Sequence, residues 1–197
     1  MNGNDRSAAI FRALHSRNYR LFFGGQLVSL TGTFLSQVAT LWLVYRLAVE
    51  SAHPERAPLL LGIVGFAAQI PMFAVAPLAG VWVDRLNRKR LLVVTQTLAM
   101  VQSFTIGILA LTHINIYQVV ALSLFQGLIN AFDMPARQAF VVEMVEERDL
   151  LPNAIALNST MVHAARLIGP SMAGILIHLI GEGWCFVMDG FSYAGVI

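Results

Sequence analysis

Polar side chains recur at intervals of three, four or eight residues in two stretches of the sequence that are otherwise apolar. The first stretch carries Gln26, Ser29, Thr33, Gln37 and Thr40, and the second carries Gln118, Gln126, Asn130 and Asp133. In a helix this spacing places the side chains of each stretch on one face. Polar groups that face lipid are costly, so both faces should contact protein or a water-filled cavity. Two interpretations remain open: a hydrophilic path for a substrate, or interhelical hydrogen bonds worth about 0.6 kcal/mol each.

Three ionisable residues near the C-terminus also lie in apolar surroundings. Arg166 falls near the middle of a predicted helix, and His163 precedes it by one turn on the same face. An arginine at the centre of a membrane span costs at least about 2.5 kcal/mol, so Arg166 needs a partner, water or an anionic ligand. Its role is either substrate binding and coupling or structural hydrogen bonding. Helical rise separates Arg166 from Asp189 by roughly 13 Å in depth. We therefore expect Asp189 to act independently, as a protonatable group.

The elements that hold these side chains are predicted from the distribution of charge. Of the 197 residues, 57% are hydrophobic and 12% are charged, about half the roughly 25% of charged residues in soluble domains. No Asp, Glu, Lys or Arg occurs in residues 21–45, 57–83 or 91–132. About 20 apolar helical residues cross a bilayer, and such hydrophobicity also excludes intrinsic disorder.

The sequence therefore predicts an all-α membrane protein with six transmembrane helices. We expect them at residues 21–47, 59–83, 91–111, 116–132, 152–180 and from 184 onward. Residues 1–20 form a predicted cytoplasmic leader, and residues 21–197 form a bundle that stops within its sixth helix. Basic residues cluster before the first helix, after the second and after the fourth, whereas the opposite side carries only Arg46 and Arg56. This bias predicts a cytoplasmic N-terminus.

The connection between the second and third predicted helices has the sequence GVWVDRLNRKR, residues 80–90. It resembles the cytoplasmic signature of the major facilitator superfamily, Gly-x-x-x-Asp-Arg-x-x-Arg-[Lys/Arg]. The matching residues are Gly80, Asp84, Arg85, Arg88 and Lys89. Gly80 is expected to let the second helix pack closely. Asn87 replaces a glycine of the signature, and asparagine also accepts left-handed backbone angles.

The resemblance implies a fold and a gate. Superfamily members have two six-helix halves, each built from inverted repeats of three helices, so this chain resembles an N-terminal half. In the family, this loop locks the cytoplasmic side when the transporter faces outward, and an acidic residue at the inner end of the fourth helix joins the lock. Asp84, Arg88 and Asp133 occupy those places. Each exposed ion pair contributes only about 0–1 kcal/mol, which suits a gate that must also open.

Three later segments, residues 133–140, 151–158 and 166–174, resemble the branch that contains bacterial siderophore and macrolide exporters. The Gly169-Pro170 step, followed by Gly174, is similar to a fifth-helix motif of proton antiporters, although the earlier glycines and the terminal glycine pair of that motif are missing. Such residues permit kinks and close helix contacts, and they are also common in membrane helices generally.

Other classes of function find little support in the sequence. The single Cys185 excludes an internal disulfide, the five histidines lack metal-ligand spacing, and no nucleophile–base motif or phosphate loop occurs. We predict no catalytic residue, metal, cofactor or nucleic-acid partner. The predicted function is efflux of a small amphipathic molecule by alternating access, coupled to protons, across a bacterial inner membrane and together with a C-terminal six-helix half. Import by the same fold and a non-transporting scaffold or receptor are the alternatives.

Overall fold

The computed structural model describes residues 17–144 and 151–196, apart from the side chains of residues 17–19, 76, 77 and 84. Most of the predicted leader and the side chain of Asp84 therefore lie outside the described residues. The described chain is helical throughout, in the order α2 (Arg17–Glu50), η2 (Pro54–Arg56), α3 (Ala57–Arg85), α4 (Arg88–Leu111), α5 (Ile116–Met144), α6 (Leu151–Ile180) and α7 (Glu182–Tyr193). This arrangement confirms the predicted all-α membrane fold.

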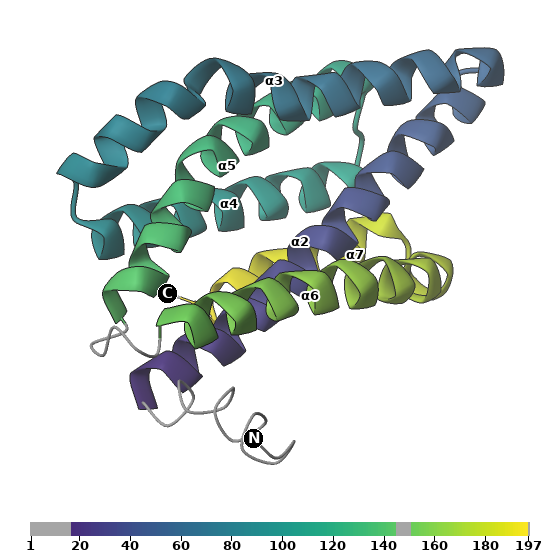
Figure 1. The fold of residues 1–197 in the computed structure, drawn as a ribbon. Coiled ribbons are helices and arrows are strands. Elements are labelled where there is room, and N and C mark those ends of the chain that lie inside the picture. The colour runs from purple at the N-terminus through teal and green to yellow at the C-terminus, as the bar shows by residue number, and fades with distance from the viewer. Residues whose placement is uncertain (1–16, 145–150, 197) are drawn as a thin grey trace.

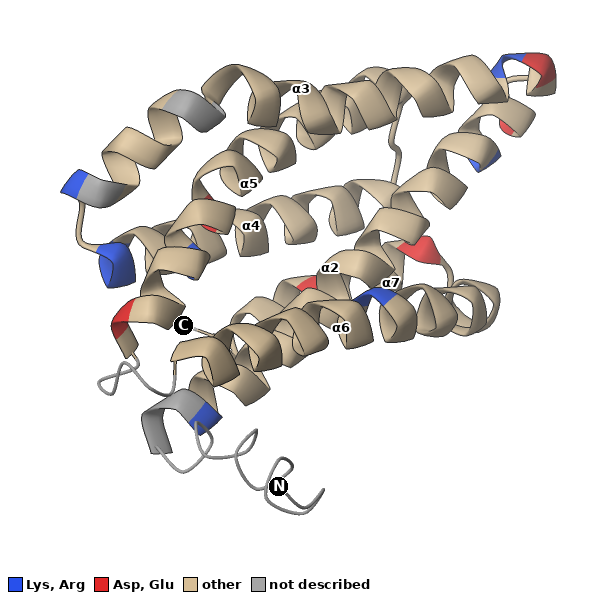
Figure 2. Cartoon of the chain, in the orientation of Figure 1, with Lys and Arg blue, Asp and Glu red and all other residues tan. Residues whose placement is uncertain are grey.

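Long apolar helices make the chain a multi-pass membrane protein. Helices α2 to α6 each contain a segment long and apolar enough to cross a bilayer, and the shorter α7 follows the tight turn at Gly181, where φ is 83°. Figure 2 shows that most charged residues lie near helix ends and that long uncharged stretches separate them. The hydrophobic segments predicted from charge spacing therefore correspond to the observed helices.

The predicted end of the fourth crossing at residue 132 is wrong. Helix α5 continues to Met144 and passes through Asp133 and Pro135. The charge of Asp133 does not end the helix, because Arg137 pairs with it one turn later. Hydrogen bonds from α4 also satisfy its carboxylate. The charge of Asp133 is tolerated inside this helix because the neighbouring side chains compensate for it.

The expected left-handed conformation at Asn87 is also not observed. Asn87 has φ −68° and ψ 109°, and its side chain accepts a hydrogen bond from the backbone N–H of Arg90 at 3.0 Å. It is the N-cap of α4, a position that asparagine favours because its side chain satisfies a free N–H group. At the start of α5, Asn115 and Gln118 exchange reciprocal backbone-to-side-chain hydrogen bonds of 3.0 Å. Gln118 is therefore part of a capping box.

The helices pack as two equivalent triplets. The main contacts join α3 to α5, α2 to α6, α4 to α7, α2 to α7 and α4 to α5. In these triplets α2 corresponds to α5, α3 to α6 and α4 to α7. Under this correspondence the α3–α5 contact is equivalent to α6–α2, and the α2–α7 contact is equivalent to α5–α4. The α4–α7 contact is equivalent to itself. Figure 1 shows α3 and α4 above α6 and α7, with α2 running from the lower left to the upper right, where the chain continues into α3. Because each triplet has an odd number of antiparallel helices, the second begins on the opposite side, as expected for inverted repeats.

Glycines permit the closest of these contacts. A Cβ atom added to Gly169 of α6 would lie 2.7 Å from Cβ of Phe34 and 2.8 Å from the carbonyl oxygen of Thr31, both on α2. One added to Gly127 of α5 would overlap the carbonyl group of Ala68 on α3. Small residues let membrane helices approach in this way.

Two glycines that the sequence motifs singled out, Gly80 and Gly174, do not make such close contacts. Within the described residues, no atom lies within 4 Å of a Cβ added to Gly80 or Gly174. The expected close packing at Gly80 is therefore not present inside this bundle. Of the predicted Gly169-Pro170-Gly174 motif, Gly169 is the residue that makes a tight helix contact.

Candidate binding cavity and the buried polar network

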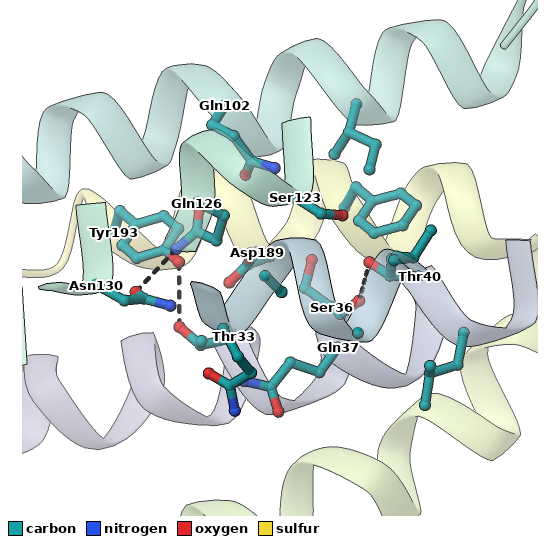
Figure 3. Close-up of a pocket in the computed structure, with 17 residues that line it drawn as sticks. Thr33, Ser36, Gln37, Thr40, Gln102, Ser123, Gln126, Asn130, Asp189 and Tyr193 are labelled. Atoms are coloured by element: carbon teal, nitrogen blue, oxygen red, sulfur yellow. Dashed lines mark hydrogen bonds between the residues drawn. The ribbon is translucent and has the colours of Figure 1, made fainter. Parts of the chain in front are cut away.

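A cavity of about 230 Å³ lies among five of the helices: α2, α3, α4, α5 and α7. Its wall combines apolar side chains with hydroxyl, carboxamide and carboxyl groups. The polar lining residues are Thr33, Ser36, Gln37, Thr40, Gln69, Gln102, Ser123, Gln126, Asn130, Asp189 and Tyr193. Figure 3 shows most of these side chains gathered around one space between the helices. Polar groups collected in this way supply hydrogen bonds to a ligand in an otherwise apolar bundle.

Part of each predicted polar stripe lines this cavity. Helix α2 contributes Thr33, Gln37 and Thr40, and α5 contributes Gln126 and Asn130. The Gln126 carboxamide nitrogen donates to the side-chain oxygen of Asn130 at 3.1 Å. The Gln126 carboxamide oxygen is buried and has no hydrogen-bond partner among the described residues. A buried acceptor without a partner is costly, and a rotation of the Gln126 side chain toward the cavity would let this atom accept a hydrogen bond there.

Asp189 is the acidic residue of the cavity wall, and its partners are neutral. The residue is only 2% exposed. Ser103 of α4 donates to its Oδ2 atom at 2.6 Å, and Ser36 of α2 lines the same cavity. Ser192 approaches Oδ1 at 3.5 Å. In the part of the chain that the structure describes, no Lys, Arg or His forms an ion pair with Asp189, so an ionised carboxylate here would carry a large desolvation cost.

Gly32 lets α2 approach Asp189 closely. A Cβ atom added to Gly32 would lie 2.6 Å from Oδ1 of Asp189 and 2.5 Å from Oγ of Ser192. One turn further along α7, the Tyr193 hydroxyl lies 3.1 Å from Oγ1 of Thr33. These contacts fix the position of the acidic group relative to the polar face of α2.

Apart from Gln118, which caps α5, the remainder of both stripes forms a separate network that connects α2, α4 and α5. Asp133 accepts hydrogen bonds of 2.8 Å from Thr95 and from Gln96, and it pairs with Arg137. With its carboxamide oxygen directed toward Arg137, Gln26 accepts hydrogen bonds from the guanidinium group. Ser29 donates to the Gln96 carboxamide oxygen at 3.3 Å. Gln26, predicted to line a substrate path, is fully buried in this network instead.

The length of the polar stripes explains why part of each lines the cavity and part belongs to the network. Gln26 and Thr40 are 14 residues apart in sequence, a separation of about 21 Å along a helix, which is too long for one cavity of the observed size. The two segments of each stripe therefore have different surroundings, at different depths. One segment of each stripe faces the cavity, and the segment nearer the α3–α4 loop forms interhelical hydrogen bonds.

The α3–α4 loop and α5 make a different contact from the one that the sequence indicated. Arg88 lies 3.4 Å from a carboxylate oxygen of Glu143 at the end of α5. Asp133 is 5% exposed and is held within the bundle, so its interaction is not the exposed ion pair that we expected. Arg85 and Lys89 are exposed. The grouping of Asp84, Arg88 and Asp133 as a gate stays a prediction.

Arg166 and His163 lie on the exposed surface of α6, and no residue of α6 lines the cavity. The Arg166 guanidinium carbon lies 5.5 Å from the centre of the Phe34 ring. This cation–π contact is worth about 0.5–1 kcal/mol at an exposed site. A role for these two residues in a substrate path is not visible within the described bundle and stays a prediction.

Several cavity residues were not predicted from the sequence. Gln69 and Ser123 are isolated polar residues in apolar runs, Gln102 is followed directly by Ser103, and Tyr193 lies in the last helix. None of them belongs to a stripe, so periodicity does not reveal them. The only available signal was the presence of a carboxamide in an uncharged segment, which is costly in lipid and therefore implies a polar neighbour.

Comparison with known proteins gives one family and two relatives. A family described as transmembrane secretion effector matches residues 8–197. The chain is 22% identical to a staphyloferrin A transporter of Staphylococcus aureus over 88% of this chain and 42% of that protein. It is 29% identical to multidrug resistance protein 1 of Bacillus subtilis over 65% of this chain and 32% of that protein. The chain thus spans less than half the length of these relatives. No solved structure matches it.

Proposed function

Because the chain belongs to the transmembrane secretion effector family of the major facilitator superfamily, we propose that it is the N-terminal half of a transporter that exports a small amphipathic molecule by alternating access. The observation that carries this proposal is the cavity with a polar wall inside an apolar membrane bundle. A cavity between inverted triplets near the middle of the bilayer is where such folds bind substrates. The second wall of the path is a C-terminal six-helix half.

Export is favoured over import by the family description and by the relatives. The matched family is described by secretion, and one relative is named a multidrug resistance protein. We place the transporter in a bacterial plasma membrane with a cytoplasmic N-terminus, because basic residues cluster in the α3–α4 loop. In this orientation the Arg88–Glu143 contact lies at the cytoplasmic face, where Asp84, Arg88 and the neighbouring residues are proposed to form the gate.

Coupling to protons is proposed at Asp189. A carboxyl group whose partners are hydroxyls can retain hydrogen bonds in either protonation state, because a hydroxyl both donates and accepts. A buried carboxyl without a cationic neighbour gains most from being neutral when the cavity is empty. Proton binding and release at Asp189 would then accompany the movement of substrate.

The test is transport by the intact protein in proteoliposomes loaded with a fluorescent amphipathic dye. We expect dye movement against its gradient when a proton gradient is imposed, and loss of this movement when an ionophore collapses the gradient. Asp189→Asn should abolish coupled movement, whereas Glu50→Gln, which removes an exposed carboxylate at the far end of α2, should not. Absence of vectorial movement in folded wild-type protein would contradict transport and favour a scaffold. Coupled movement that survives Asp189→Asn would remove this residue from coupling.

A further inference from the structure

We infer that the cavity binds the head of a neutral or cationic molecule that donates hydrogen bonds, and that it discriminates against carboxylates. This inference deepens the proposed function and rests on it. It concerns the chemistry of the described wall, which is built from α2, α3, α4, α5 and α7.

The charges of the wall are one-sided. Among the 17 lining residues, Asp189 is acidic and none is Lys, Arg or His. Two basic residues of the bundle are engaged elsewhere, since Arg137 pairs with Asp133 and Arg46 pairs with Glu182 at 2.6 Å. An anionic group entering the cavity would therefore lose water without gaining a counter-charge from the described residues, whereas an ammonium group would meet the Asp189 carboxyl.

The hydrogen-bonding groups of the wall that lack a partner also favour a ligand that donates hydrogen bonds over a carboxylate. The Gln126 carboxamide oxygen is buried and has no partner among the described residues. The amide nitrogen of the same side chain donates to Asn130. Figure 3 shows Gln126 beside the space that Asn130 and Tyr193 also face. Once the Gln126 side chain turns toward the cavity, this acceptor is satisfied by an O–H or N–H group of a ligand and not by a carboxylate, which only accepts.

The apolar part of the wall and the cavity size indicate an amphipathic ligand that is only partly enclosed. Leu41, Val64, Ile106 and Phe186 supply apolar surface beside the polar groups. The volume of about 230 Å³ is below the roughly 300–1,000 Å³ that encloses a drug-sized molecule. The described wall therefore accommodates one end of such a molecule, the end that carries the donor groups.

Three probes with one naphthalene ring and different heads test this inference: 1-naphthylmethylamine, 1-naphthalenemethanol and 1-naphthoate. Their dissociation constants are measured by equilibrium dialysis against the intact protein in nanodiscs. We expect the amine and the alcohol to bind, and the carboxylate to bind at least about tenfold more weakly, because it lacks a donor and meets Asp189. This ranking is measured on wild-type protein and does not depend on any variant folding.

Two variants separate the groups responsible. Asp189→Asn should weaken the amine about tenfold more than the alcohol, because only the amine carries a charge for the carboxylate. Gln126→Leu should weaken the amine and the alcohol alike, because both lose the same acceptor. Binding of the alcohol to Asp189→Asn also shows that this variant is folded.

The inference is overturned if 1-naphthoate binds as tightly as the amine, if none of the three probes binds, or if the preference for the amine persists in Asp189→Asn. These results differ from a failure of the proposed function. Vectorial transport with the wrong ranking removes only the ligand class, and the expected ranking without transport removes only the transport activity.

Discussion

Two of the buried carboxyl groups in the described part of this bundle, those of Asp133 and Asp189, have opposite surroundings. Asp133 is paired with Arg137 and receives two further hydrogen bonds from Thr95 and Gln96 on α4. Asp189 receives hydrogen bonds from serines and lies in the wall of a cavity. The first carboxyl is compensated by protein and connects three helices, whereas the second retains capacity for a proton or a ligand. Burial alone therefore does not identify a functional acid; the charge of its partners does.

The strongest way to break this comparison is to remove one partner of the compensated pair. Arg137→Met leaves Asp133 buried without its cation, which should lower the free energy of unfolding by about 3–5 kcal/mol. Unfolding in mixed micelles, followed by far-ultraviolet circular dichroism, measures the change. The double variant Asp133→Asn with Arg137→Met should recover part of the loss, because no uncompensated charge remains. A single variant as stable as wild type would show that the network is not structural.

The approach of α2 to Asp189 gives the next largest effect. Gly32→Ala places a Cβ atom against Asp189 and Ser192, and overpacking of this kind costs about 1–3 kcal/mol. Gly24→Ala is the matched control on the same helix, because no described atom lies within 4 Å of a Cβ at that position. The same unfolding measurement should separate the two variants. Equal stability would mean that α2 and α7 are not as closely packed at Asp189 as described.

Asp189→Asn should change stability much less than the disruption of the Asp133 network. An asparagine side chain keeps an acceptor for Ser103 and introduces no charge, so we expect a change of about 1 kcal/mol or less in the free energy of unfolding. Gradient-driven dye export should nevertheless be lost. A large loss of stability in Asp189→Asn would instead assign Asp189 a structural role and make the two carboxyl groups equivalent.

The exposed pair Arg88–Glu143 should have the smallest effect on stability. Its side chains are 32% and 59% exposed, and solvent-exposed ion pairs contribute about 0–1 kcal/mol. A double-mutant cycle with Arg88→Ala and Glu143→Ala should therefore give a coupling energy in this range. A coupling energy as large as the effect of Arg137→Met would show that exposure does not separate the surface pair from the buried one.

The prediction for the α3–α4 loop identified the family signature but missed one residue that the loop region contacts. The sequence around Asp84 identified the family signature, which the family match supports. It did not identify Glu143, because the predicted fourth helix ended at residue 132 and α5 extends to Met144. When a helix is assumed to end at residue 132, residues beyond that point are not considered as partners across the bundle. The length of α5 depends on hydrogen bonds that Asp133 receives from another helix, and these cannot be read from the local sequence.

The amino-acid sequence by itself determined that this chain crosses a membrane in long helices and approximately where they lie. This follows because the cost of placing polar groups in lipid is a property of each local segment. Only the tertiary structure decided that Thr33 and Gln126 face a cavity while Gln26 and Asp133 belong to an internal network. That division depends on which helices meet at each depth, and close contacts at residues such as Gly32 and Gly169, far apart in the sequence, set it.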